Sequence, residues 1–440
     1  MRIYSFLVSL LLCTISILPL RAQQKWSLEE CVEYAYNNNL QIKQQEIAVK
    51  QAENNLKQSK LDFIPSFNAS LGHNFNWGKS VNINDLEIIT NRLTQSTSAN
   101  ISTSTPIIEG LAKHYTLKSS RTQLQITRQE VEKLKNEISI AITQAYLQVL
   151  LAVEIEKCAK QSYKSVEQQR NRSKILVEAG SQPYSTLLDI EAQLASELVQ
   201  LVAAGNDVKS NLLTLAQLME LPEDDQFEVE IPFLEDSIGL HSNEDISTIY
   251  AQALSLPQIK GAELQLQKSR YDYKMQKGQL FPSIAFTAGY GTYFSDSQNS
   301  AFFDQFNENR NPSVGFSLSI PILNGWRRGS ALRNAGYNVE NTELELQKRH
   351  NTLYKEIQQA STNAENAYAK YRAATQNMRA SRESFSYVEN KFNAGVLNST
   401  DYVVAKTNLF KAESEYYQSK FQYIFQLKIL DFYKGTPIKL

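Results

Sequence analysis

The sequence of 440 residues has few of the side chains that carry catalytic or metal chemistry. It contains only four histidines, His73, His114, His241 and His350, and their spacing along the chain does not fit a zinc site. No glycine-rich loop has the spacing that cradles phosphate, and no serine, histidine and aspartate set has supporting context. We therefore predict a protein that is not an enzyme, with no catalytic residues, no metal and no cofactor.

Neither sign of charge is in excess. The chain carries 45 basic and 46 acidic residues, for a formal net charge of −1. A chain that binds nucleic acid usually has a marked surplus of lysine and arginine. The composition therefore gives no indication of a nucleic-acid partner or of an acidic substrate.

Long hydrophobic runs are confined to the start of the chain. Arg2 is followed by an apolar stretch up to Leu20, and Ala22 precedes a polar start at Gln23. This pattern predicts a secretory signal peptide over residues 1–22, cleaved after Ala22. Cys13 lies deep in the apolar stretch, whereas lipoprotein acylation needs a small residue before the cysteine, so ordinary cleavage is favoured.

Beyond this leader we find no run of about 20 apolar residues, so we expect no membrane-spanning helix. Any insertion into a membrane must then use strands. The mature chain keeps Cys31 and Cys158, which could pair outside the cytoplasm. Two thiols so far apart on helical segments are more often small packed side chains, and the sequence leaves the choice open.

A coiled-coil seam runs through the stretch 337–393. Apolar or small residues alternate there at steps of four and three: Leu353, Ile357, Ala360, Ala364, Ala367, Tyr371, Ala374, Met378, Ser381, Phe385, Val388 and Phe392. The pattern stops at Gly395, a residue that commonly ends helices. Counted from Gly325, the helix has roughly 70 residues and a length of ~100 Å. No compact domain of ordinary size needs a helix of this length, which indicates that the helix bridges a distance larger than such a domain.

The chain is a tandem duplication. Gln41 recurs as Gln258, and Pro65 recurs as Pro282, both at a separation of 217 residues. Farther on, Pro106 and Gly110 recur as Pro321 and Gly325, and Gly180 recurs as Gly395, all at 215. Constant offsets over such a distance indicate two copies of one structural unit.

Each copy has the same parts in the same order. In the first repeat, over 23–220, we predict a helix over 27–60, strands over 66–77 and 95–105, a long helix over 111–178, a turn near Gly180 and a helix over 184–219. In the second, over 245–440, we predict a helix over 245–277, strands over 283–294 and 312–320, a long helix over 326–393, a turn near Gly395 and a helix over 399–432. Residues 221–244 form a linker packed on the outside, with one short strand candidate at 227–231. The fold class is thus mostly α with a small β part.

The predicted strands alternate with a period of two. In the first, Phe67, Leu71, Phe75 and Trp77 share one face, while serine, glycine and asparagine occupy the other. This pattern, about ten residues long and ending in aromatics, is typical of transmembrane β-barrel strands around a wet lumen. A half-buried sheet in a soluble sandwich is the alternative. Four strands cannot close a barrel, and open edges cannot face lipid, so several chains must share one barrel.

These features together resemble the TolC family of outer-membrane efflux proteins. The resemblance rests on the signal peptide, the duplicated helix, strand and helix unit, the Ala-Gly turns, and the Pro321, Gly325, Trp326 and Arg327 segment that opens the second rod. It implies a homotrimer in which long coiled-coil helices form an α-barrel and each chain adds four strands to a transmembrane β-barrel. Four strands and four helical tracks per chain agree with twelve of each in three chains. The prolines Pro65, Pro106, Pro282 and Pro321 then mark the junctions between barrel and helices.

The resemblance also implies a location and partners. The protein is expected in the bacterial outer membrane, in contact with its lipid, with a long periplasmic extension. A periplasmic adaptor and an inner-membrane transporter of the RND or ABC type are expected to dock at the exposed tip turns, at Gly180 and Ser181 and at Gly395 and Val396.

A gate residue is implied in the same way. The family carries an acidic residue six positions after the second tip glycine, facing the constricted entrance, and Asp401 occupies that position here. The first turn departs from the pattern, with Thr186 at the sixth position and Asp189 at the ninth, so the ring of carboxylates is thinner than usual. The ordinary alternative is that Asp401 only offsets the dipole and free amides of the helix it begins.

The function that follows is an exit duct of a tripartite efflux system, with passive passage of substrates to the outside. An exit duct for type I protein secretion is an alternative, and so is a non-conducting coiled-coil or adhesin stalk. A stalk would carry a binding domain where the rods end in small residues and glycine. A porin for passive uptake would have little use for the long rods. Nothing in the chain identifies the cargo.

Overall fold

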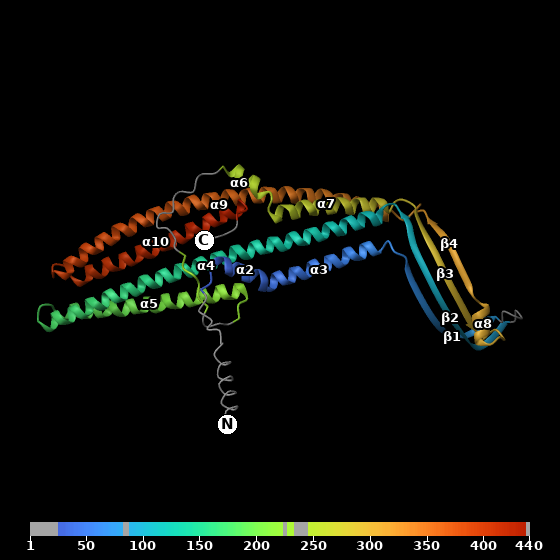
Figure 1. Ribbon diagram of the computed structural model, residues 1–440, viewed down its shortest axis with the longest axis horizontal. Coiled ribbons are helices and arrows are strands. Elements are labelled where there is room, and N and C mark those ends of the chain that lie inside the picture. Colours follow the sequence, from blue (N-terminus) through green and yellow to red (C-terminus); the bar gives the residue numbers. More distant parts are fainter. Residues whose placement is uncertain (1–24, 82–87, 223–226, 233–244, 437–440) are drawn as a thin grey trace, which may run out of the picture. The chain divides into compact units, whose positions relative to one another are not determined.

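The computed structural model describes residues 25–81, 88–222, 227–232 and 245–436 (Figure 1). Its helices are α2 (Leu28–Asn38), α3 (Leu40–Leu61), α4 (Ala112–Glu178), α5 (Tyr184–Met219), α6 (Ile246–Ala253), α7 (Pro257–Gly278), α8 (Phe302–Glu308), α9 (Arg327–Asn393) and α10 (Ser399–Tyr433). Its strands are β1 (Ser66–Val81), β2 (Ile88–Glu109), β3 (Ser283–Ser295) and β4 (Asn311–Ser319). The predicted combination of a mostly helical chain with one small sheet is confirmed. The predicted signal peptide with Cys13, and most of the linker over 221–244, lie outside the described residues.

The compact units of the chain do not coincide with the two repeats. One unit comprises Met1–Gln44, Glu132–Leu256 and Thr352–Leu440, and the other comprises Gln45–Val131 and Pro257–Asn351. The second unit, hereafter the sheet unit, holds all four strands; the first is the tip unit. Each unit takes segments from both repeats, because strands of one repeat pair with strands of the other and the two long helices continue through both units.

The first helix of each repeat is interrupted, contrary to the prediction of one continuous helix. At Asn39 the backbone leaves the helical region, and the Asn39 side chain accepts the amides of Gln41 and Ile42 at 2.9 and 3.3 Å. Asn39 therefore caps the start of α3. In the second repeat α7 begins at Pro257, whose missing N–H suits the first position of a helix. Both signals were present in the sequence and were missed.

The sheet is antiparallel, with the order β1-β2-β3-β4. Strands β1 and β2 are longer than predicted, since main-chain pairing continues to Gly78↔Arg92 and beyond a bulge after the side-chain alternation has ended. Helix α8, in the connection between β3 and β4, was not predicted. Figure 1 shows it at one end of the sheet.

Neither face of the edge strands is covered within the sheet unit. The apolar side chains Phe67, Leu71 and Trp77 on β1 and Val314 and Phe316 on β4 are 72–77% exposed. The serine and asparagine side chains on the opposite face of the same strands are exposed as well. A half-buried sheet in a soluble sandwich needs a second layer on its apolar face. The described residues supply none.

The hydrophobic core of the tip unit is built on α4 and the coiled-coil seam. Tyr146, Val149 and Leu150 of α4 pack with Leu28 and Cys31 of α2. Along α9, ten of the twelve predicted seam residues are buried, and Ser381 and Val388 are partly buried. The seam packs against α10, as in the cluster of Tyr371, Met378, Ala412, Tyr416 and Tyr423.

Two expectations need correction here. By length and composition, one stretch of α4 is apolar enough to cross a membrane. The apolar residues of its 142–152 segment belong to the core of the tip unit, which explains their hydropathy. The strand candidate at 227–231 is reduced to a single parallel bridge between Trp26 and Val229. Next to this bridge the Tyr146 hydroxyl donates a hydrogen bond to the Glu230 carbonyl at 2.6 Å.

Candidate functional site

The two tip turns have the same backbone. After α4, Gly180 takes a φ of 72°, the Ser181 amide donates to the Leu176 carbonyl and the Gly180 amide to Val177. After α9, Gly395 takes a φ of 73°, with amide bonds from Val396 to Lys391 and from Gly395 to Phe392. This Schellman arrangement needs a left-handed residue, which glycine adopts without strain. The predicted docking residues Gly180, Ser181, Gly395 and Val396 are all exposed.

The two predicted gate carboxylates have different surroundings. Asp401 lies in the first turn of α10, where its amide donates to the side chain of the N-cap residue Asn398 at 2.8 Å, and its side chain is exposed. Asp189, one turn into α5, accepts a hydrogen bond from the Ser399 hydroxyl at 2.7 Å. The structure thus ties Asp189 to the start of α10. Ser399 was not singled out from the sequence, because its importance depends on a contact across 210 residues.

Further contacts join the two repeats near the tip. Arg172 of α4 donates to the Asn393 carbonyl at the end of α9, at 3.1 Å. Below it, Val166 and Ile190 of the first repeat pack with Phe392, Tyr402 and Leu409 of the second. The tip is therefore one packed structure within the chain.

Two buried side chains of opposite charge lie on α10 and α5, the helices that follow the tip turns. Lys406 of α10 is 7% exposed and Glu197 of α5 is 2% exposed. Burial lowers the pKa of the Lys406 ammonium, and the nearby carboxylates, Glu197 first among them, oppose this effect. Its ammonium also lies 4.9 Å from the centre of the Phe385 ring. No sequence signal marked this pair, since neither residue belongs to a motif.

The junction prolines have unequal positions. Pro65 and Pro282 directly precede β1 and β3, and Pro321 follows β4. Pro106, in contrast, lies inside β2 and pairs with Ala285, with a bulge directly after it. Strand β2 thus continues for three residues beyond Pro106, to Glu109, before the chain turns into α4.

The chain leaves the sheet instead through two left-handed residues in each repeat. These are Gly110 and Leu111 before α4, with φ of 55° and 64°, and Gly325 and Trp326 before α9, with φ of 59° and 63°. Two consecutive residues of positive φ make a tight turn of the primed type. Arg328, the residue after Arg327 at the start of α9, donates to the Gln279 carbonyl.

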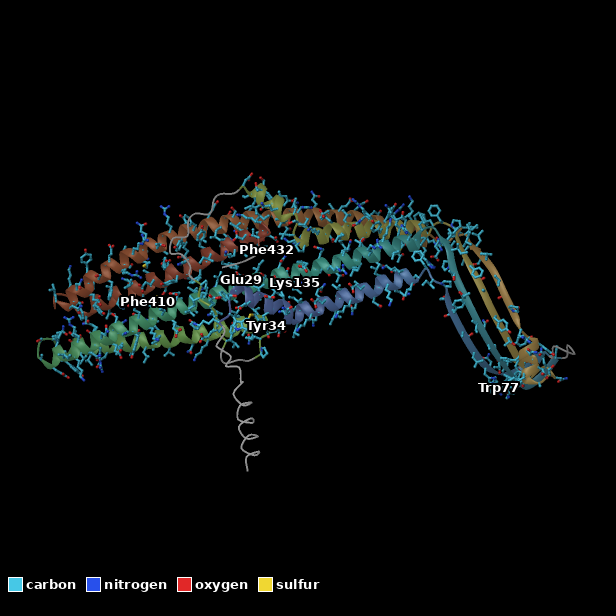
Figure 2. All side chains as sticks on the ribbon, in the orientation of Figure 1. Glu29, Tyr34, Trp77, Lys135, Phe410 and Phe432 are labelled. Atoms are coloured by element: carbon cyan, nitrogen blue, oxygen red, sulfur yellow. The ribbon has the colours of Figure 1, made fainter. Side chains whose placement is uncertain are left out.

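Aromatic rings gather toward one end of β1. Trp77 lies near the end of the sheet that carries α8 (Figure 2). Its ring stacks on Phe75 with centroids 6.4 Å apart, and Phe75 in turn meets His73 edge to face at 4.6 Å. Aromatic side chains are enriched where a membrane-spanning strand reaches the lipid headgroups.

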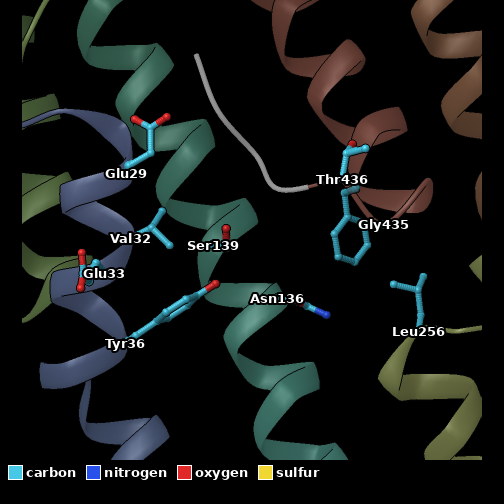
Figure 3. Close-up of a pocket in the computed structure, with 10 residues that line it drawn as sticks. Glu29, Val32, Glu33, Tyr36, Asn136, Ser139, Leu256, Gly435 and Thr436 are labelled. Carbon is cyan, nitrogen blue, oxygen red and sulfur yellow. The ribbon is translucent and has the colours of Figure 1, made fainter.

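A pocket of about 530 Å³ lies in the tip unit between α2, α4 and the end of α10 (Figure 3). Glu29, Val32 and Tyr36 line it from α2, and Asn136 and Ser139 from α4. Burial raises the pKa of the Tyr36 hydroxyl, and a hydrogen bond with Ser139 opposes the shift. None of the predicted site residues lines this pocket. Among the described residues, no group of three His, Cys, Asp or Glu side chains could hold a metal ion.

Both repeats match a known family. Residues 32–220 and 249–435 match the family described as outer membrane efflux protein. The chain belongs to this family. Membership places the protein in the outer membrane and makes the long helices its periplasmic extension. The family consists of channel proteins rather than enzymes.

Similar proteins are distant in sequence and close in fold. The chain is 22% identical to the alkaline protease secretion protein AprF of Pseudomonas aeruginosa over 71% of its own length and 64% of AprF, less than two thirds of that relative. It is 20% identical to the outer membrane efflux protein BepC of Brucella suis over 85% of this chain and 78% of BepC. A crystal structure of CusC superposes with a TM-score of 0.79 at 14% identity, covering 96% of both chains.

Proposed function

We propose that this chain is the exit duct of a tripartite efflux system, in which three copies share one strand barrel and one tube of helices. The observation that carries the proposal is the bare sheet, which has no second layer over its apolar face and no pairing on its two outer edges within the described residues. In hydrocarbon, unpaired strand edges are too costly, so such a sheet must close with other copies. Three chains of four strands give twelve, enough to leave a water-filled channel.

The tip turns are the proposed docking sites for a periplasmic adaptor. Gly180 and Gly395 would meet no atom within 4 Å if they carried a Cβ, so a partner can approach the backbone there. An inner-membrane transporter of the RND or ABC type would deliver the cargo, which then passes outward without chemistry. The exposed apolar side chains of β1 and β4 face lipid in this assembly. Site-specific crosslinking from Ser181 or Val396 in cells should capture a periplasmic protein, and no capture at either position would count against docking.

Type I protein secretion is the second candidate, since the relative AprF is a protease secretion protein, whereas BepC is an efflux protein. The two candidates differ in the phenotype of a deletion strain. Loss of an efflux duct should raise sensitivity to small toxic compounds and leave secreted proteins unchanged. Loss of a secretion duct should do the reverse.

Asp401 is the proposed gate residue, because its carboxylate is exposed at the start of α10 while that of Asp189 is engaged by Ser399. In planar bilayers the wild-type protein should conduct, and multivalent cations should block it. Asp401→Asn should weaken that block by removing one negative charge per chain. Asp189→Asn is the matched control and should change the block less.

Each outcome of the bilayer experiment decides one statement. A purified wild-type protein that never conducts would contradict the proposal that the chain forms a duct. If the protein conducts and the cation block is the same with and without Asp401→Asn, the assignment of Asp401 as gate residue is contradicted. The proposal that the chain forms a duct is then unaffected.

A further inference from the structure

The two edges of the sheet, β1 and β4, end differently from the paired strands. Strand β2 continues to Glu109, beyond its last pair with β1 at Ser104, because residues 105, 106, 108 and 109 pair with β3. Strand β4 stops at Ser319, which is its last pair with β3. The residues that follow include Ile322 and Leu323, whose side chains are 90% and 92% exposed. The end of β4 lacks the partner that the end of β2 has.

The sequence offsets between the repeats also hold in the register of the sheet. Ser66 of β1 pairs with Ser104 of β2. Adding 217 to the first number and 215 to the second gives Ser283 and Ser319, which pair in the second repeat. The same addition reproduces every observed pair between β3 and β4. The duplication is therefore a reliable guide to which backbone groups face each other.

One interface between repeats is seen inside the chain, where β2 of the first repeat pairs with β3 of the second. We propose that β4 pairs with β1 of a second copy of this chain in the register that β2 has with β3. Applying the offsets, Ser104↔Thr287 becomes Ser319 facing Ser70 of the second copy. The inference rests on the proposed function only in that copies share one barrel; it adds which residues meet.

This register matches the chemistry of the two edges. It places Leu318 opposite Leu71 and Phe316 opposite His73, so that the apolar faces join. A slip by one residue would reverse the faces of one strand. On the polar face, the pair Asn100–Gly291 inside the chain corresponds to Gly315 of β4 facing Asn74 of the second copy's β1. Both pairs join an asparagine to a glycine, but the two residues have exchanged strands.

A slip by two residues would keep the faces but lose other features. In the three observed strand pairings, every glycine faces a residue with a side chain. A slip in one direction would set Gly315 opposite Gly72 and leave a gap between the strands. The proposed register sets Gly72 opposite Ser317, which copies the internal pair Gly289–Ser102.

The proposed pairing also covers the exposed end of β4. Continued past Ser319, it sets Ile320 opposite Ala69 and Pro321 opposite Asn68. Ile322 corresponds to the bulged residue Ile107, and Leu323 then meets Phe67. Strand β4 therefore extends to Asn324 in the assembly, as β2 extends to Glu109.

Disulfide crosslinking in native outer membranes tests the register. In a Cys31→Ala, Cys158→Ala background, Ser319→Cys combined with Ser70→Cys should yield covalent dimers and trimers on mild oxidation. Ser319→Cys alone should stay monomeric. The matched control is Ser104→Cys with Thr287→Cys, the internal equivalent, which should form a bond without any increase in mass.

Two slipped pairs complete the test. Ser319→Cys with Asn68→Cys, and Ser319→Cys with Gly72→Cys, should crosslink roughly fivefold more slowly, since diagonal neighbours are about 7–8 Å apart rather than about 5 Å. A slipped pair that reacts fastest would overturn the register while leaving a shared sheet. If no pair links chains while the internal control forms, the shared sheet is overturned, whereas conduction by the wild-type protein tests the duct separately.

Discussion

The two repeats share the backbone of their turns and differ in the side chains through which they meet. Both end their long helix at a left-handed glycine and both enter it through two left-handed residues. In contrast, the tip contact inside the chain is polar, with the Ser399 hydroxyl donating to Asp189. At the offset of 215, Tyr184 occupies the position that corresponds to Ser399, and Val404 the position that corresponds to Asp189. The side chains of Tyr184 and Val404 carry no formal charge and are 62% and 53% exposed in the single chain.

The buried charges follow the same division. By the offset of 215, Lys406 and Glu197 correspond to Glu191 and Ala412, which do not carry opposite charges. Backbone turns have been kept in both copies because the fold depends on them. The contact residues differ between the copies, and in the proposed assembly one interface lies within the chain while the other lies between copies.

The largest expected effect concerns the glycines that lead out of the sheet. A Cβ on Gly110 would lie 2.0 Å from the Gly278 carbonyl oxygen, whereas a Cβ on Gly325 meets nothing within 4 Å. We expect Gly110→Ala to cost more than about 4 kcal/mol, at the top of the range for single substitutions, since backbone must move. Gly325→Ala should cost only about 1–2 kcal/mol, the strain of a left-handed alanine.

The amount of protease-resistant protein in outer membranes measures this difference, with the unfolding midpoint in detergent as a second readout. The position equivalent to Gly278 is Leu61, whose side chain prevents an equally close approach to Gly325 from a second copy. Equal losses in the two variants would show that the contact between copies is as tight as the internal one.

The sequence predicted the repeated features well and the single contacts poorly. The seam on α9 and the tip glycines follow from local spacing, and α5 has the predicted bounds of 184–219. Strand β2 ends beyond the predicted residue 105 because it is extended by pairing with the other repeat, which a local pattern does not contain. Ser399 and Asp189, which share a hydrogen bond, and Lys406 and Glu197, whose charges influence each other, lie about 210 positions apart, and no local rule connects them.

Glu197→Gln should have the second largest effect. The substitution keeps a side-chain oxygen for the Gln193 amide, which in the wild-type protein donates to Glu197 at 2.8 Å. It removes the carboxylate that, among those near Lys406, most favours the charged form of the ammonium. Leaving a buried ammonium with less compensation should cost about 2 kcal/mol, less than breaking a direct buried ion pair, because Glu389 and Glu413 remain. Thermal unfolding of the detergent-solubilised protein at neutral pH measures the loss.

The pH dependence has a definite sign. The pKa of Lys406 is lowered from 10.5 by burial, so between the folded value and 10.5 the unfolded chain binds more protons and stability rises with pH. Glu197→Gln lowers the folded pKa further, so the loss should shrink as pH approaches 10.5. Glu191→Gln, a carboxylate substitution at the position of the first repeat that corresponds to Lys406, is the control. It breaks only a half-exposed contact with Arg170 at 3.5 Å and should cost less than about 1 kcal/mol; a loss as large as that of Glu197→Gln would contradict the distinction between the two interfaces.

The smallest expected effect comes from the ends of α5 and α10, which carry the same turn with different residues. Glu220 has a φ of 58° and Gly435, at the offset of 215, has a φ of 76°, and in both turns the next amide donates to a carbonyl five residues earlier. Only the first copy therefore bears the strain of a left-handed side chain, which is exposed and makes no packing that a glycine would lose. Glu220→Gly should raise the free energy of unfolding by about 1 kcal/mol, and Gly435→Ala should lower it by a similar amount. Opposite shifts in the unfolding midpoint would show that the two turns are equivalent in energy as well as in geometry, whereas a loss in Glu220→Gly would mean that the carboxylate makes a contact in the assembly that the single chain does not contain.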